Sequence, residues 1–312
     1  MRAVLGLVMF VILGMGCAGG TVAAEPAAAP AASIDSLRAT LDRMVAGAEG
    51  RVGVAVALID TGEEVAIAGD ERFPMQSVFK LPLAMTVLDA VDRGVLHLDQ
   101  HVRVTPADSV SDRQHSPIRD RHPAGTTLRV SDLLRAAASG SDGTAADVLL
   151  GLVGGPGAVT AYVRALGIGG LTVAVTEKDM GRDPEAQYRN WATPLGAVAV
   201  LRALDAGQGL LPPSRQLLLR LLTETPTGPN RIRGRLPGGT PVAHKTGSSR
   251  TVDGITAATN DVGIIHLPDG QRIAIAVFVS DSTADDAARE RVIAEVARLA
   301  YDAAAARSRQ PG

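Results

Sequence analysis

One stretch of this 312-residue chain reads Arg72-Phe73-Pro74-Met75-Gln76-Ser77-Val78-Phe79-Lys80. Apolar residues at helical spacing follow it to about Arg93, which predicts a helix that begins near Ser77. Residues i and i+3 share a helix face, so Lys80 is expected beside the Ser77 hydroxyl. A serine becomes a nucleophile when a neighbouring base takes its proton, and a desolvated lysine is such a base. Ser-x-x-Lys also arises by chance, because an N-cap serine with a lysine in the first helical turn has the same spacing.

Lysine is rare in this chain. Of 31 Lys and Arg residues, only Lys80, Lys178 and Lys245 are lysines. A chain that uses arginine for generic positive charge keeps lysine where a compact or deprotonatable amine is needed. Genome composition alone can produce the same bias, so the count supports the Ser77–Lys80 pair without establishing it.

The composition is that of a globular protein, with 46% hydrophobic and 21% charged residues. Its length allows a large core and two sub-domains. The net charge of −2 leaves no basic excess to neutralise phosphates, and 3% aromatic residues provide few stacking platforms for bases. Nucleic acid is therefore not expected as a partner.

The N-terminus has the features of an export signal. Residues 2–16 begin with Arg2 and continue as a short apolar run, too short to span a bilayer. Small residues up to Ala24 predict cleavage there, with a signal peptide at 1–24, an Ala/Pro-rich linker at 25–32 and a periplasmic or secreted product. Lipid anchoring through Cys17 is the alternative. Because Cys17 is the only cysteine, the mature chain has no internal disulfide.

Hydrophobic periodicity predicts the remaining elements. Helices are expected at 33–48, 77–93, 130–139, 144–152, 156–166, 194–206, 213–223 and 284–305. Strands are expected at 52–59, 65–68, 242–246, 256–267 and 271–280. Two stretches lack a clear period: 101–127, with three prolines, is predicted to be a long surface connection, and 172–191 a compact surface loop.

This order predicts an α/β fold. The late strands are expected to extend the early hairpin into an antiparallel five-stranded sheet, flanked by the N- and C-terminal helices. The α/β sub-domain would comprise residues 33–76 and 226–307, with 77–225 inserted as an all-α sub-domain. A cleft between the two sub-domains is the expected place for a site.

Three short motifs are expected to meet in that cleft. They are Ser77-x-x-Lys80, Ser141-Asp142-Gly143 and Lys245-Thr246-Gly247-Ser248. Ser-x-x-Lys, Ser-Asp-Asn and Lys-Thr-Gly form the signature of class A β-lactamases and penicillin-binding proteins. Two of the three lysines fall within this set, which makes a chance origin of the Ser77 motif improbable.

Nearly the whole mature chain resembles class A serine β-lactamases. The similar motifs are Phe73-Pro74-Met75-x-Ser77-Val78-Phe79-Lys80, Thr227-Gly228-Pro229-x-Arg231, His244-Lys245-Thr246-Gly247 and Ala258-Thr259-Asn260-Asp261-x-Gly263. The stretches Thr176-Glu177-Lys178-Asp179-Met180 and Gln187-Tyr188-x-Asn190-Trp191 resemble a subgroup with Glu-x-x-Met in its omega loop, several members of which are extended-spectrum enzymes. The resemblance implies a β-lactamase/transpeptidase-like fold.

The resemblance also implies catalytic roles. Ser77 would attack the lactam carbonyl and form an acyl-enzyme, and Lys80 would exchange a proton with it. Glu177 would activate the water that hydrolyses the ester. Whether Lys80 or Glu177 starts acylation stays open. Ser141 would pass a proton to the lactam nitrogen, with the positive charge of Lys245 beside it.

Five further residues would bind substrate by the same resemblance. They are Gly143, Thr246, Ser248, Arg231 and His115. Arg231 would bind the substrate carboxylate. His115 would stack on substrate at the cleft rim, although a simply exposed histidine fits the sequence equally well.

Two positions depart from the family pattern. Gly143 replaces an Asn that is expected to contact the amide arm of the substrate. Gly181 stands where many members have an Asn that helps to hold the deacylating water. Weaker substrate positioning and slower deacylation are the expected consequences.

Two other functions share these motifs: a D-alanyl-D-alanine carboxypeptidase, and a penicillin-binding sensor that stays acylated. Glu177 argues against both, because each lacks an efficient deacylating base. The substrate is thus expected to be a small β-lactam that a monomer hydrolyses without cofactor or metal. His97 and His101 lack the glutamate of a metalloprotease motif.

Overall fold

A computed structural model describes residues 3 and 34–308 of the chain. Residues 34–308 fall within one compact unit. Apart from Ala3, the predicted signal peptide at 1–24, Cys17 and the linker at 25–32 lie outside the described residues, so these remain predictions.

The centre of the fold is a five-stranded antiparallel sheet in the order β2-β1-β12-β11-β8. Its strands are β1 (Arg51–Leu58), β2 (Glu64–Ile67), β8 (Val242–Ser248), β11 (Thr259–His266) and β12 (Arg272–Ser280). The early hairpin β1–β2 is joined to the late strands where Val54 pairs with Val277. The predicted sheet and its antiparallel extension are confirmed.

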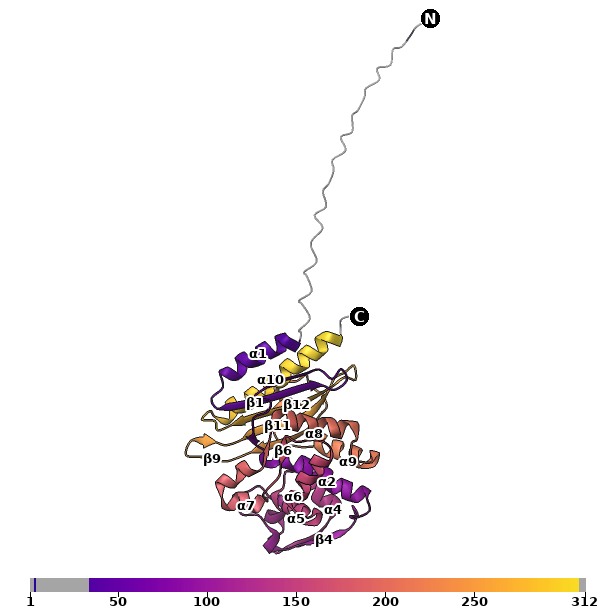
Figure 1. The fold of residues 1–312 in the computed structure, drawn as a ribbon, viewed down its shortest axis with the longest axis vertical. Coiled ribbons are helices and arrows are strands. Elements are labelled where there is room, and N and C mark those ends of the chain that lie inside the picture. Colours follow the sequence, from indigo (N-terminus) through magenta and orange to yellow (C-terminus); the bar gives the residue numbers. More distant parts are fainter. Residues whose placement is uncertain (1–2, 4–33, 309–312) are drawn as a thin grey trace. The chain divides into compact units, whose positions relative to one another are not determined.

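The two faces of the sheet bury different side chains, because successive residues of a strand point to opposite faces. Val54 and Val56 of β1 belong to a cluster with residues of α1 (Ile34–Ala46) and α10 (Asp286–Ser308). Ala55 and Ala57 belong to the core that includes α8 (Pro194–Ala206). Small alanines allow α8 to approach the sheet closely. Figure 1 shows α1 and α10 on one side of the sheet and α8 on the other.

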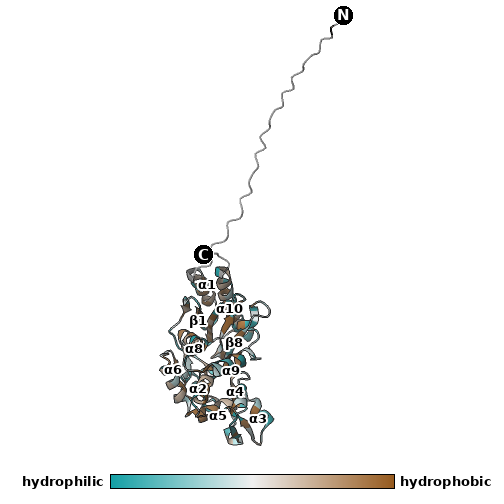
Figure 2. Cartoon of the chain, turned by 90° about the vertical axis from the view of Figure 1, so that its right-hand side faces the viewer, coloured by the Kyte–Doolittle hydropathy of each residue, from teal (hydrophilic) through white to brown (hydrophobic). Residues whose placement is uncertain are grey.

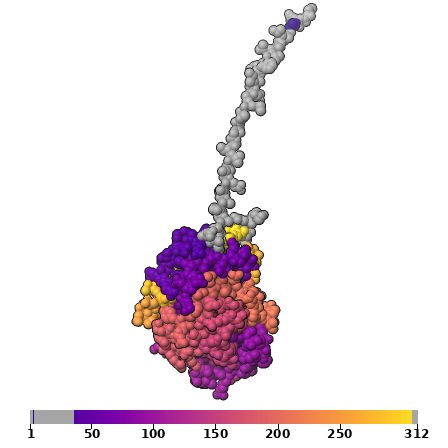
Figure 3. Space-filling view, viewed as in Figure 1, coloured from indigo at the N-terminus to yellow at the C-terminus, as the bar shows by residue number. Residues whose placement is uncertain are grey.

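Hydrophobic residues, brown in Figure 2, run along the sheet and the helices that cover it. In the space-filling view of Figure 3, the indigo surface near α1 adjoins the yellow end of α10, in agreement with their packing. The predicted flanking of the sheet by the first and last helices is therefore confirmed.

The middle of the chain is mainly helical, as predicted. Its helices are α2 (Lys80–Asp92), α3 (Pro117–Arg121), α4 (Val130–Ala138), α5 (Gly143–Val153), α6 (Pro156–Ala165), α7 (Glu177–Arg182), α8 and α9 (Pro212–Thr223). None of the described helices is by itself long and apolar enough to cross a membrane; α5 and α6 meet that test only as a pair bent by 69°.

The region predicted to be a long surface connection is partly regular, so that prediction was wrong. β4 (His101–Val104) pairs with β5 (Thr126–Arg129), and the three prolines lie between these strands. Val104 is buried and Val102 is half-buried, an inward alternation too short to stand out in the sequence. The middle of the chain is therefore not purely helical.

A second unpredicted hairpin follows β8. β9 (Thr251–Val252) pairs with β10 (Ile255–Thr256), and the turn has Asp253 at φ +49° and Gly254 at φ +79°. The predicted strand 256–267 is thus divided into β10 and β11. The boundaries between the two sub-domains, at 76/77 and 225/226, stay predictions.

Candidate active site

Ser77 lies in a 3₁₀ turn, η1 (Gln76–Phe79), immediately before α2. The N-cap residue of this turn is Met75, without a side-chain capping bond, so Ser77 is not the N-cap serine of the alternative interpretation. Asn260 of β11 donates through Nδ2 to the carbonyl oxygens of Pro74 at 2.8 Å and of Met75 at 3.2 Å. These bonds tie the serine-bearing turn to the sheet.

β8 approaches the same turn closely at Gly247. A Cβ atom at this position would lie 2.3 Å from the Met75 carbonyl oxygen. Only glycine permits this approach, which brings the Ser77 turn against β8.

Lys80 lies at the centre of the site with 1% of its residue surface exposed. Its Nζ donates to Ser77 Oγ at 2.9 Å and to the Ser141 carbonyl oxygen at 2.8 Å. The same atom is 2.6 Å from Oε1 of Glu177. The contacts to Ser77 and Ser141 are hydrogen bonds and the contact to Glu177 is an ion pair, so the buried charge is paired, as a buried ion requires. The predicted Ser77–Lys80 proximity is present.

Glu177 begins α7, whose N-cap is Thr176 in a capping box with Asp179. The backbone N–H groups of Glu177 and Lys178 donate to the two carboxylate oxygens of Asp147, at 2.7 and 3.0 Å. Burial raises the pKa of Asp147 to about 6, although these N–H donors oppose the shift. Asp147 thus secures the end of the helix that presents Glu177.

Gln114 also holds the Glu177 side chain. Its Nε2 donates to Glu177 Oε2 at 3.0 Å and also to the Glu177 carbonyl oxygen. Oε1 therefore faces Lys80 and Oε2 faces Gln114, so both carboxylate oxygens are held.

Ser141 and Lys245 meet on the other side of Ser77. Lys245 is fully buried on β8, and its Nζ donates to Ser141 Oγ at 3.0 Å and to the Thr246 carbonyl oxygen at 3.1 Å. Ser141 has φ +59°, and the next residue, Asp142, is the N-cap of α5. Burial, and then the nearby charge of Lys80, lower the pKa of Lys245 to about 7.

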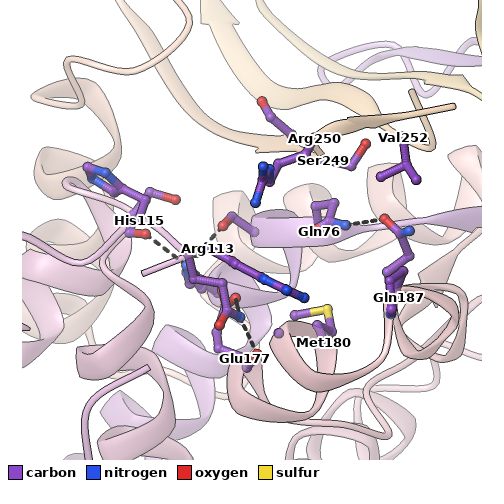
Figure 4. A pocket seen from close by; sticks show the side chains of 16 residues that line it. Gln76, Arg113, His115, Glu177, Met180, Gln187, Ser249, Arg250 and Val252 are labelled. Atoms are coloured by element: carbon purple, nitrogen blue, oxygen red, sulfur yellow. Dashed lines mark hydrogen bonds and ion pairs between the residues drawn. The ribbon is translucent and has the colours of Figure 1, made fainter. Parts of the chain in front are cut away.

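These groups face a cleft with a volume of ≈ 420 Å³. Six of the ten predicted site residues line it, namely Ser77, Lys80, His115, Ser141, Glu177 and Ser248. Figure 4 shows the side chains at the cleft, with Gln76 bonded to Gln187 across it at 2.5 Å.

The other four predicted residues lie behind the lining. Lys245 contacts the cleft-lining Ser141, to whose Oγ its Nζ donates. Thr246 is buried, with its Oγ1 2.7 Å from Thr227 Oγ1. The backbone N–H of Gly143 donates to the His115 carbonyl oxygen at 2.9 Å.

Arg231 is 8% exposed, and its guanidinium is fully engaged. Nε donates to Glu290 at 3.1 Å, and NH2 donates to Ser248 Oγ at 2.7 Å. NH1 donates to the carbonyl oxygens of Gly247 and Asn260. In this arrangement Arg231 supports Ser248 from behind, and it is not part of the cleft wall.

Sequence reasoning missed Gln114 and Asp147. Asp147 is the only charged residue within Gly143–Val153, and an acid on such an apolar helix is a signal of a buried partner. Gln114 lies in an aperiodic polar stretch, where the sequence offers no comparable signal. Among residues 34–308, no group of three or more His, Cys, Asp or Glu side chains could hold a metal ion.

A serine beside a buried lysine, in a cleft next to an antiparallel sheet, is typical of hydrolases that use a Ser–Lys variant of the catalytic triad. Comparisons with known proteins specify the class further. A model described as "Beta-lactamase enzyme family" matches residues 36–304.

Curated relatives agree with that match. The extended-spectrum β-lactamase PER-1 of Pseudomonas aeruginosa is 44% identical over 266 residues, which are 85% of this chain and 86% of PER-1. The β-lactamase VEB-1 of the same species is 37% identical over 273 residues, 87% of this chain and 91% of VEB-1.

Solved structures show the same fold. A β-lactamase from Chitinophaga pinensis has a TM-score of 0.84 at 44% identity, covering 86% of this chain and 99% of its own. A class A β-lactamase representative from Bacteroides cellulosilyticus has a TM-score of 0.81 at 35% identity, covering 86% and 96%. The chain belongs to the class A β-lactamase family.

Proposed function

We propose that the protein hydrolyses β-lactam antibiotics through an acyl-enzyme on Ser77 and thereby confers resistance. The observation that carries this proposal is the position of Lys80, whose Nζ is 2.9 Å from Ser77 Oγ and 2.6 Å from Glu177 Oε1. One amine thus links the nucleophile to a carboxylate that can accept a proton.

Acylation begins when Ser77 Oγ attacks the lactam carbonyl carbon. Lys80 donates to Ser77 in the resting site, so it can accept the serine proton once its own proton has moved to Glu177. The alternative route takes the serine proton through a water to Glu177. Backbone N–H groups of Ser77 and Ser248 would stabilise the oxyanion, each by roughly 3 kcal/mol.

The lactam C–N bond then breaks, and its nitrogen takes a proton from Ser141. Glu177 returns its proton to Lys80, whose Nζ lies beside Ser141, and Lys80 passes a proton to the Ser141 hydroxyl, while Lys245 stays protonated and donates to Ser141 Oγ at 3.0 Å. Over the whole step one proton has moved from Ser77 to the lactam nitrogen, Glu177 is again a carboxylate, and Ser77 carries an ester.

Deacylation consumes one water. Glu177 takes a proton from the water as its oxygen attacks the ester carbonyl, the ester C–O bond breaks, and Ser77 Oγ regains a proton. Because Glu177 is buried and held by Lys80 and Gln114, its carboxylate is preorganised for this transfer.

Nitrocefin, a chromogenic β-lactam, tests the proposal. The purified protein should hydrolyse many equivalents, and Ser77→Ala should abolish both turnover and the covalent adduct seen by mass spectrometry. A single stoichiometric burst with a stable wild-type adduct would instead identify a penicillin-binding protein.

The N-terminal sequence supports export as part of this proposal. We expect a soluble periplasmic or secreted enzyme beginning at Glu25, monomeric and independent of metal. Intact mass, light scattering and activity in a chelator test these expectations, and a lipidated product would place the anchor on Cys17 instead.

A further inference from the structure

Gln114 occupies the space above Gly181 on α7. A Cβ atom at position 181 would lie 2.3 Å from Gln114 Oε1 and 3.0 Å from its Cδ. The carboxamide of Gln114 therefore fills the volume that any side chain at 181 would need. Residues 177 and 181 are four apart on α7, so this volume adjoins the Glu177 side chain.

The Gln114 carboxamide is also correctly oriented for a donor role. Nε2 points at Glu177 and donates to Oε2 at 3.0 Å. Oε1 lies over Gly181, 3.4 Å from Ser111 Oγ. Exchanging the two amide atoms would set an oxygen against the carboxylate, so the Glu177 contact determines the orientation.

The backbone of Gln114 is held by a nearby cation. Arg119 NH1 donates to the Gln114 carbonyl oxygen at 2.9 Å and also to that of Ser111. Ser116, two residues further on, donates to Asp142 at 3.0 Å. This turn is therefore joined to the start of α5, which also carries Ser141 towards the cleft.

We propose that Gln114 is the positioning residue for Glu177, and that its amide takes the place of a side-chain amide that Gly181 cannot provide. The inference rests on the proposed deacylating role of Glu177. One carboxylate oxygen is held by Lys80 and the other by Gln114, which leaves the group in one orientation towards Ser77. A hydrogen bond to a charged group is stronger than one between neutral groups, so its loss should be measurable.

Gln114→Met isolates the donor. Methionine has similar length and fills the space above Gly181, but it has no N–H. We expect nitrocefin turnover to fall roughly 10- to 100-fold, with acyl-enzyme on Ser77 accumulating in quenched samples and the melting temperature unchanged. Gln216→Met, at an exposed position of α9, is the matched control and should behave as wild type.

A rescue separates positioning from general disruption. Gln114→Ala opens the volume above residue 181, and Gly181→Asn in that background returns an amide one helical turn from Glu177. The double variant Gln114→Ala/Gly181→Asn should deacylate faster than Gln114→Ala/Gly181→Ala, which fills the space without a donor.

These experiments distinguish a failure of the Gln114 positioning role from a failure of the proposed β-lactamase function. If the wild type forms no Ser77 adduct and shows no turnover, the proposed function fails. If the wild type turns over and Gln114→Met deacylates at the same rate, the positioning role is wrong. The positioning role is also overturned if Gln114→Ala/Gly181→Asn deacylates no faster than Gln114→Ala/Gly181→Ala.

Discussion

Lys80 and Glu177 form an ion pair of 2.6 Å in which 1% and 8% of the two side chains are exposed. Removing one charge of a buried pair leaves the other uncompensated, so each partner constrains the other. The pair therefore holds the carboxylate in position, and in the proposed mechanism it also gives the protons of Ser77 and Lys80 a common acceptor.

Glu177→Gln keeps the shape of the side chain but removes the base. General-base catalysis contributes roughly 10²- to 10⁴-fold, so turnover should fall by that order and acyl-enzyme should accumulate on Ser77. Stopped-flow kinetics with quenched mass spectrometry measures both. Glu185→Gln, an exposed change in the same loop, is the control. Unchanged hydrolysis in Glu177→Gln would mean that another group activates the water.

We expect activity to fall at high pH because Lys245 loses its positive charge there. Burial lowers its pKa to about 7, so its positive charge is lost as pH rises through that value. If the cation attracts the substrate carboxylate, kcat/KM should decline above about pH 7.

Lys245→Arg tests this assignment, because a guanidinium stays charged throughout the accessible range. When kcat/KM is measured from pH 5 to 9, its decline at alkaline pH should shift to higher pH in this variant. The same decline in both proteins would assign the titration to a different group.

We expect the free energy of unfolding to decrease as pH rises, because of the buried carboxyl group of Asp147. Its folded pKa is raised from 3.8 to about 6, so the folded state binds the proton more tightly than the unfolded chain. The resulting stabilisation is fully present below about pH 4 and is lost as pH rises through about 6. Two pKa units correspond to about 3 kcal/mol, as an order of magnitude.

Urea unfolding at pH 4.5 and pH 7 measures this contribution. Asp147→Asn cannot ionise and should flatten the dependence. It should also loosen α7, because an amide offers only one acceptor oxygen to the N–H groups of Glu177 and Lys178. An equal pH dependence in wild type and variant would contradict the assignment.

Local patterns in the sequence were sufficient for the sheet. Val54 and Val56 alternate with Ala55 and Ala57 within one apolar run, and strands of this length with short connections have few antiparallel arrangements. The pair β4–β5 was missed because both strands have only four residues, with one buried residue in β4 and none in β5, and such strands carry little periodic signal.

Within the site, too, contacts between residues close in sequence could be predicted, and contacts between distant residues could not. Ser77 and Lys80 are three residues apart, so a helical turn alone brings them together. Gln114 and Glu177 are 63 residues apart, and the contact depends on how the turn before α3 folds over α7. No local rule predicts such a contact. The sequence shows a glycine at 181, but only the three-dimensional structure shows what fills the space above it.

Gly143 provides a test of substrate specificity. An added Cβ would lie 3.3 Å from the His115 carbonyl oxygen and 3.3 Å from Val110 Cγ2, a tight but not prohibitive fit. Gly143→Asn should therefore lower the free energy of unfolding by about 1–3 kcal/mol, the usual cost of overpacking.

The same variant should improve recognition of an amide arm on the substrate. One neutral hydrogen bond contributes about 1 kcal/mol, so kcat/KM should rise roughly fivefold for penicillins that carry the amide side chain. A penicillin nucleus without that side chain is the control and should gain nothing, because it has no group for the new carboxamide to bind. Equal changes in kcat/KM for both substrates would mean that the residue at 143 does not contact the amide arm. The substitution would then act by moving His115 at the cleft rim.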